Sequence, residues 1–206
     1  EEAEAIEWID AHAAEHDGPD YVLTEWGRNR MFNYAVNGES DTYGYALRTY
    51  EPFVRDQNPD SYADEFRGRV GYVVIHELDA DAPETSGYVQ LFENYGSATP
   101  AANGSGRFRL AYVTADDSIT VFRPVAGATV TGEAEPGTSV TVRATVTAAG
   151  EEFAYERRAT ADQNGTFAVG VASPGAYAVQ GGSSGGATVE VLDTAARSRE
   201  PVPVVS

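Results

Sequence analysis

Apolar residues recur with two different periods along the chain, and the period changes near residue 125. Before that point, helical and strand-like patterns alternate. Residues 1–16 place Ala5, Trp8, Ile9 and His12 on one helical face, and residues 20–26 are predicted to form a strand. The continuous apolar run at 69–75, RVGYVVI, is typical of a strand that is buried on both faces.

Helical patterns over 45–57 and 58–68 come before this strand. Pro52 is expected either near the start of a helix or at a break in one. A short helix is predicted over 86–96, and a further strand over 106–114. Strands separated by helices predict an α/β domain over residues 1–125 with a mostly parallel central sheet.

From residue 126 onward, short runs of small and β-branched residues alternate with polar ones. Gly-containing turn signals separate these runs, at Pro136-Gly137, Ala149-Gly150, Asn164-Gly165 and Pro174-Gly175. This pattern predicts a small all-β sandwich domain, immunoglobulin-like, over residues 126–195. Residues 196–206 are expected to form a loose tail.

Charge narrows the classes of function. The 206 residues carry a formal charge of −18, and all 14 basic residues are Arg, with no Lys. Acidity of this kind, without any Lys, is typical of a halophilic protein whose charges are screened by concentrated salt. A chain with no basic stripe is not expected to bind nucleic acid.

Cysteine content, apolar run length and the start of the sequence indicate which kind of protein the chain belongs to. No cysteine is present, which excludes disulfides. No apolar run approaches the roughly 20 residues of a membrane span. The sequence starts inside a predicted helix without an initiator Met, so we expect it to be a piece of a longer protein.

Two motifs suggest metal chemistry. His12, Glu15 and His16 match the H-x-x-E-H signature of inverted zinc proteases, but the sequence offers no evident third ligand. The segment HELDADAPE follows the buried strand and could hold a cation, although it lacks the glycine of a calcium loop. Its candidate ligands are His76, Glu77, Asp79, Asp81 and Glu84. We therefore expect no cofactor in this domain and no catalytic residue.

Two further sequence features concern possible modification and a flexible turn. Asn103 and Asn164 both begin glycosylation sequons, which matter only if the domain faces outside the cell. Ser183 and Ser184 lie in a Gly-rich stretch that is predicted to be a flexible turn.

The segment TEWGRNRMFNY, just after the first predicted strand, is the candidate binding site. Trp26 offers a flat apolar surface, while Arg28 and Arg30 could pair with carboxylates or phosphate. Asn29 could hydrogen-bond a peptide amide or a sugar. The alternative is a structural loop whose aromatic side chains pack on neighbouring helices.

The order of these pieces resembles the extracytoplasmic C-terminal region of archaeal oligosaccharyltransferase catalytic subunits, or a divergent paralogue. The resemblance rests on EAIEWIDAHAAEHDGPDYVLTEWGRNRMFNY, then RVGYVVI, YVQLFENYGSA and RFRLAYVTADDSITVFRPVAGATV. The appended ATVTGEAEPGTSVTVRATV is similar to the small β-domain of haloarchaeal members. In the family, a W-W-D-Y-G segment grips the acceptor sequon, and here it falls on residues 25–29, where only Trp26 is kept.

The resemblance implies a function that this chain would share with a membrane-embedded enzyme. Trp26 would contact the acceptor, and Glu25 would supply a carboxylate in place of the missing Asp. Catalysis and a divalent metal would reside in the enzyme's own membrane domain, with the acceptor polypeptide and a lipid-linked glycan as partners. The domain would lie on the extracytoplasmic side of the cell membrane. The alternative is a non-catalytic binding or scaffold module of a haloarchaeal surface-anchored protein.

Overall fold

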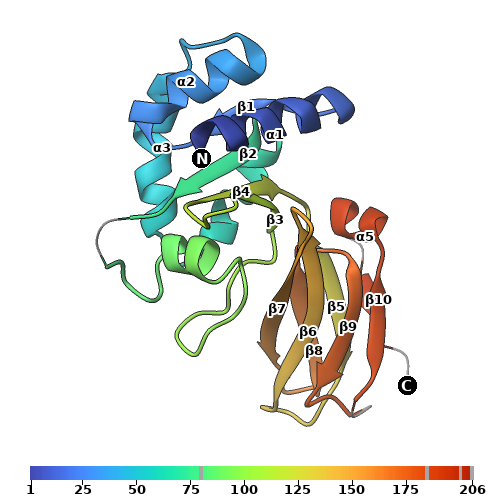
Figure 1. Cartoon of the computed structure of the whole chain (residues 1–206). Coiled ribbons are helices and arrows are strands. Elements are labelled where there is room, and N and C mark those ends of the chain that lie inside the picture. The colour runs from blue at the N-terminus through green and yellow to red at the C-terminus, as the bar shows by residue number, and fades with distance from the viewer. Residues whose placement is uncertain (79–80, 184–185, 200, 205–206) are drawn as a thin grey trace.

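The computed structural model of the protein describes residues 1–78, 81–183, 186–199 and 201–204. Figure 1 shows a part rich in helices, formed by the first half of the chain, beside an elongated β part formed by the second half. Strands β1 to β4 make one sheet, and strands β5 to β11 make two others.

The sheet of the first half is mixed. Its strands lie in the order β1-β2-β4-β3, and of the described pairs only β1 and β2 are parallel. The prediction of a mostly parallel sheet is therefore wrong. A short turn joins β3 to β4, and it must reverse the chain because a parallel crossover needs about a dozen residues. The strands are β1 (Tyr21–Leu23), β2 (Val70–His76), β3 (Phe108–Val113) and β4 (Ile119–Pro124).

Helices cover both faces of this sheet. Tyr72 and Val74 of β2 share one apolar cluster with Ile9, and Val73 and Ile75 belong to a second cluster with side chains from α3 and α4. The expected strand at 69–75, buried on both faces, is confirmed. The described helical segments are α1 (Glu2–Glu15), α2 (Trp26–Asn37), α3 (Tyr43–Arg55), the 3-10 helix η1 (Pro59–Tyr62), α4 (Ala63–Arg67) and the π-helix η2 (Val89–Glu93).

Pro52 differs from the expectation, because it lies inside the last turn of α3 and does not break the helix. It is exposed, so water can solvate the carbonyl that its missing N–H leaves free. Among the described residues, none of the helices combines the length and apolar character that a transmembrane span requires.

The second half of the chain forms two sheets around a common core of small apolar side chains. One has the order β10-β9-β6-β7 and the other β11-β5-β8. The strands are β5 (Ala128–Glu133), β6 (Ser139–Ala148), β7 (Glu151–Thr160), β8 (Thr166–Val171), β9 (Gly175–Gln180), β10 (Thr188–Val191) and β11 (Pro201–Pro203).

The end of the chain is more ordered than predicted. Helix α5 (Asp193–Ser198) packs on β5, and β11 pairs in parallel with β5. The expectation of a loose tail is therefore wrong for these residues. Burial of Ala195 and Ala196 in the core holds the helix, and Val202 packs partly against the same core.

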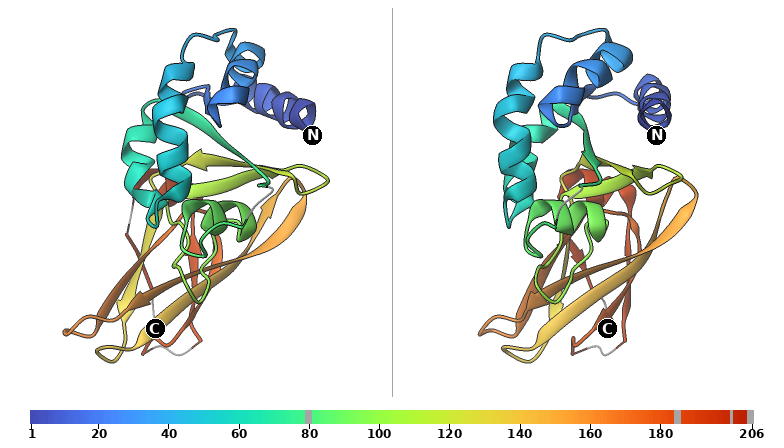
Figure 2. Two further views of the ribbon diagram at one scale, coloured as in Figure 1. Left: turned by 90° about the vertical axis from the view of Figure 1, so that its left-hand side faces the viewer. Right: turned by 60° about the vertical axis from the view of Figure 1, so that its left-hand side comes forward.

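Close backbone contacts join the two halves, which lie side by side in every view (Figures 1 and 2). A Cβ atom on Gly106 would lie 2.6 Å from the carbonyl oxygen of Gly170, so only glycine fits there. The buried hydroxyl of Tyr155 donates to Ser105 O (2.6 Å) and accepts from Ala172 N (3.0 Å). These contacts hold the β part against the sheet of the first half.

Candidate functional site

The segment after β1 begins a helix at once. The predicted strand over 20–26 ends at Leu23, and α2 begins at Trp26 with Glu25 as its N-cap residue. The backbone N–H groups of Arg28 and Asn29 donate to Glu25 O at 3.1 and 2.9 Å. The expected recognition loop is thus the first turn of a helix, which fixes the direction of each side chain.

Asn29 is buried and has a structural role. Its Nδ2 donates to Val22 O (2.7 Å), and the hydroxyl of Tyr21 reaches its Oδ1 (3.4 Å). Because its exposed fraction is 0% and its amide is satisfied internally, the prediction that Asn29 contacts a ligand is wrong for this structure. Its role is to hold the start of α2 against β1.

Trp26 points away from the core, with an exposed fraction of 59%. Together with Glu25 it lines a cavity of about 790 Å³, here called the Trp26 pocket. This volume lies within the range of roughly 300–1,000 Å³ that is typical of small-ligand sites. The prediction that these two residues stand at an accessible surface agrees with their position.

The other walls of the Trp26 pocket come from two segments that sequence reasoning did not assign to a site. Leu47, Tyr50 and Val54 lie along one stripe of α3. Leu78 and Tyr88 belong to the segment that follows β2, and Tyr88 Oη accepts a hydrogen bond from Leu78 N (2.9 Å). The spacing of the α3 residues, at i, i+3 and i+7, is the signal that could have revealed this wall.

The chemistry of the pocket is mostly apolar with polar groups on its rim. Burial raises the pKa values of Tyr50 and Tyr88, so both hydroxyls stay protonated at neutral pH and can donate hydrogen bonds. On the rim, Glu51 pairs with Arg55 (2.6 Å), and Glu25 pairs with Arg28. The pocket can therefore receive an apolar group flanked by hydrogen-bonding groups.

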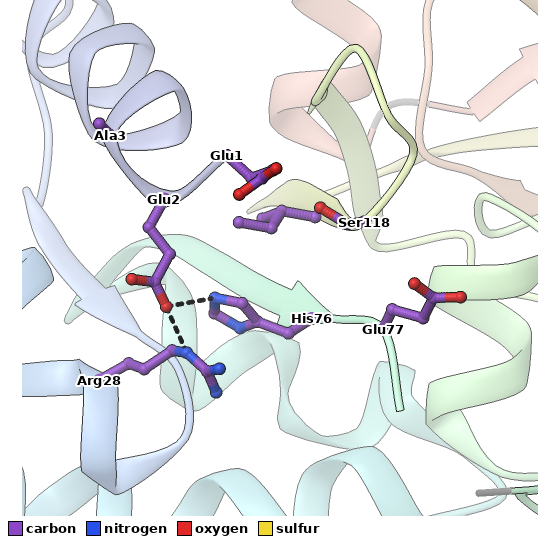
Figure 3. Close-up of a pocket in the computed structure, with 8 residues that line it drawn as sticks. Glu1, Glu2, Ala3, Arg28, His76, Glu77 and Ser118 are labelled. Carbon is purple, nitrogen blue, oxygen red and sulfur yellow. Dashed lines mark hydrogen bonds and ion pairs between the residues drawn. The ribbon is translucent and has the colours of Figure 1, made fainter. Parts of the chain in front are cut away.

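Arg28 faces a different cavity. Its guanidinium contacts the carboxylates of both Glu2 and Glu25, so it ties the start of α1 to the start of α2. Figure 3 shows it beside Glu2 and His76 in a neighbouring cavity of about 440 Å³. Arg28 therefore orients the Glu25 carboxylate through their ion pair. Arg28 itself does not line the Trp26 pocket.

His76 lies behind this ion pair at the end of β2. Its Nε2 is 3.9 Å from Glu2 Oε1, and its Nδ1 is 3.5 Å from Thr24 Oγ1. Burial, reinforced by the nearby Arg28 charge, lowers the pKa of His76 to about 4, although Glu2 opposes the shift. The imidazole is therefore neutral at pH 7.

Arg30 lies on the outer side of α2. Its guanidinium carbon is 5.3 Å from the centre of the Tyr43 ring, which is a cation–π distance. The five predicted site residues thus separate: two line the Trp26 pocket, and the others are Arg28 at the neighbouring cavity, the buried Asn29 and the outward-facing Arg30.

Neither candidate metal motif, at residues 12–16 or 76–84, forms a set of metal ligands among the described residues. Within the described ranges, no three His, Cys, Asp or Glu side chains come together in a way that could hold a metal ion. His12 Nδ1 bonds Tyr72 Oη (2.7 Å), and its ring stacks on His16 with centroids 3.8 Å apart. Asp79 of the second motif lies outside the described residues, as does Ser184 of the predicted Gly-rich turn.

Comparison with known proteins gives both a sequence match and a fold match. Residues 127–198 match the family model of the archaeal glycosylation protein B long peripheral domain. No curated protein sequence matches the chain significantly.

Solved structures from Archaeoglobus fulgidus share the fold. Its oligosaccharyltransferase, tethered to an acceptor peptide with an NVT sequon, has a TM-score of 0.68 at 12% identity. The same organism's AglB, in complex with an inhibitory peptide and a dolichol-phosphate, gives 0.67 at 12%. Each match covers 92% of this chain but only 38% of the solved chain.

These matches confirm the resemblance that the sequence predicted. The chain is similar to the archaeal oligosaccharyltransferase AglB, by sequence to its long peripheral domain over residues 127–198 and by fold over 92% of its length.

Proposed function

We propose that this chain is the outward-facing domain of a membrane-embedded glycosyltransferase resembling oligosaccharyltransferase. The likeness in fold supports this proposal, and so does the match of residues 127–198 to a peripheral domain of a glycosylation protein. Because the chain spans about two fifths of the solved relatives, catalysis is assigned to a membrane portion outside these residues, with this domain on the extracytoplasmic side. In this proposal, the lipid-linked glycan and the divalent metal that the resemblance implies belong to that portion.

In this proposal, the Trp26 pocket binds the acceptor polypeptide near its sequon. One observation carries it: the exposed indole of Trp26 stands on the rim of an apolar cavity, in a fold shared with enzymes solved with peptides. An indole and an apolar pocket suit a peptide side chain, and the Tyr hydroxyls suit its backbone carbonyls. Glu25 would accept a hydrogen bond from the acceptor, with Arg28 holding its carboxylate in place.

The test is glycosylation of a sequon peptide by the full-length enzyme in membranes. We expect Trp26→Ala to raise the KM for the peptide by about 30-fold, because truncating a central interface aromatic costs roughly 2 kcal/mol. Glu25→Ala should have a smaller effect in the same direction. Leu192→Ala is the matched control, because Leu192 is also exposed (62%) but lies on the β part, away from the pocket.

A direct binding measurement separates this function from the alternative of a scaffold module. Peptide binding should shift the fluorescence of the exposed Trp26 to shorter wavelength, whereas the more enclosed Trp8 contributes a constant background. The acceptor assignment fails if Trp26→Ala leaves the KM for the peptide unchanged and a sequon peptide does not shift the fluorescence of Trp26. A full-length protein that transfers no glycan would favour the scaffold module instead.

A further inference from the structure

Exposed apolar side chains gather on two neighbouring helices. Of the seven large apolar side chains that the described residues expose, five lie on α2 and α3. They are Trp26, Met31, Tyr34, Tyr43 and Leu47. Trp26 and Leu47 line the Trp26 pocket, but the other three do not, so acceptor binding gives no reason for their exposure.

These three side chains form one surface together with Arg30. Tyr34 follows Arg30 by four residues and Met31 by three, which makes it a neighbour of both on the surface of α2. Tyr43, at the start of α3, lies under the Arg30 guanidinium. We call this surface, made of Arg30, Met31, Tyr34 and Tyr43, the outer face.

The charge around the outer face is unlike that of the rest of the chain. Helix α2 has two arginines and no carboxylate, whereas the whole chain carries a formal charge of −18. None of the ion pairs found among the described residues involves Arg30, which leaves its charge available. Along the chain, the carboxylates next to α2 are Glu25 at its start and Glu39 and Asp41 in the turn that follows it.

Tyr and Arg side chains on one exposed surface are a combination found at membrane–water interfaces. The aromatic rings occupy the headgroup level, and Arg pairs with anionic headgroups. The position in the fold agrees with this role, because α2 lies at the end of the molecule opposite the tip of the β part (Figures 1 and 2). A flat bilayer could therefore contact α2 without meeting the β sheets.

We propose that the outer face binds the surface of a lipid bilayer that carries anionic headgroups. This inference does not depend on acceptor binding, since it uses residues outside the Trp26 pocket. It explains why a strongly acidic chain keeps one helix free of carboxylates and exposes aromatic rings beside an arginine that forms no ion pair within the described residues.

Flotation of the 206-residue chain with vesicles gives the first test. Binding to vesicles with phosphatidylglycerol should exceed binding to pure phosphatidylcholine and should fall as salt is raised. Arg30→Glu should weaken it about tenfold or more, and Tyr34→Ala by several-fold. Leu192→Ala, which changes an exposed side chain on the β part, should bind as the unmodified chain does. Equal binding to both kinds of vesicle, no binding, or no loss with the two α2 variants would overturn the proposal.

A second test distinguishes lipid from a protein partner in the full-length enzyme. These 206 residues contain no cysteine, so once any cysteine elsewhere in the full-length enzyme is replaced, a fluorophore can be attached at Tyr34→Cys alone or, as the control, at Leu192→Cys. Nitroxide-labelled lipids in the membrane should quench the label at residue 34 and not the label at residue 192. A label at residue 34 that is shielded from both lipid and aqueous quenchers would mean that protein covers the outer face, and the proposal would fail.

Discussion

Asn33 pairs with Val22 as a neighbouring strand would. The backbone N–H of Val22 donates to Asn33 Oδ1 at 2.9 Å, and Asn33 Nδ2 donates back to Val22 O at 2.8 Å. β1 lies at the edge of its sheet, so this side of the strand has no strand partner in the described structure. A carboxamide offers the same donor and acceptor as a peptide group, and Asn33 thereby completes the edge of β1 from within α2.

Replacing Asn33 by Ala should lower the free energy of unfolding by about 2 to 3 kcal/mol, because the buried N–H of Val22 loses its acceptor. Tyr34→Ala, one residue along and exposed at 69%, should change it by less than about 0.5 kcal/mol. Urea denaturation followed by circular dichroism measures both. A loss for Asn33→Ala no larger than that for Tyr34→Ala would show that the strand-like pairing has no energetic weight.

This pairing explains where sequence reasoning succeeded and where it failed. The sequence indicates that Asn29 is an amide that recognises a peptide or a sugar, and both Asn29 and Asn33 do bind a peptide backbone. That backbone is the chain's own edge strand. Residue types show that an amide needs a partner, but only the packing of α2 on β1 shows that the partner is internal.

The arrangement of the sheet was predictable only in part. The burial of β2 on both faces follows from its unbroken apolar run, and the structure confirms it. β4 runs antiparallel to the two strands that it pairs with, β2 and β3. The apolar pattern of a strand does not show which strands it pairs with or in which direction. The wall that α3 gives to the Trp26 pocket was visible as a stripe of Leu47, Tyr50 and Val54, but a stripe also suits an ordinary core.

The contact between the two halves gives a second prediction. Gly106→Ala should destabilise the protein by about 1 to 3 kcal/mol, because the new methyl group would overlap the carbonyl oxygen of Gly170. Gly170→Ala should be neutral or slightly stabilising, since a Cβ atom there meets nothing within 4 Å. Thermal unfolding measures the stability of both variants, whose substituted glycines belong to the same contact. Equal effects of the two substitutions would mean that the backbone adjusts freely at this junction.

The two sequons should differ in reactivity when the chain is folded. The amide of Asn103 is held by β7, because Nδ2 donates to Arg158 O (2.7 Å) and Oδ1 accepts from Arg158 N (2.8 Å). Ser105 of the same sequon is buried and donates to Asp60 Oδ1 (2.5 Å). Asn164, in contrast, lies exposed in the turn between β7 and β8.

We therefore expect a sequon-directed oligosaccharyltransferase to modify Asn164 of the folded chain and to leave Asn103 unmodified. Mass spectrometry of proteolytic fragments measures the occupancy of each site. An unfolded or peptide form of the Asn103 sequon serves as the control, and it should become a substrate. Occupancy of Asn103 in the folded chain equal to that of Asn164 would contradict the role assigned to the Arg158 contacts.

The buried neutral His76 should make stability depend on pH. Its folded-state pKa is lowered to about 4 by burial and by Arg28, against an ordinary value of 6.5, so the unfolded chain binds a proton more readily. Stability is therefore fully present above pH 6.5 and falls as the pH drops from there toward 4, by at most about 1.4 kcal/mol per pH unit. His76→Gln should reduce the slope of unfolding free energy in this window without abolishing it, because His12 also has a lowered pKa, and urea titrations at several pH values measure the slope. His12→Gln is the comparison, because burial also lowers the pKa of His12 to about 4, so its loss should remove a further part of the same slope. If the slope between pH 4 and 6.5 is the same with and without His76, burial does not hold the imidazole neutral in the folded protein.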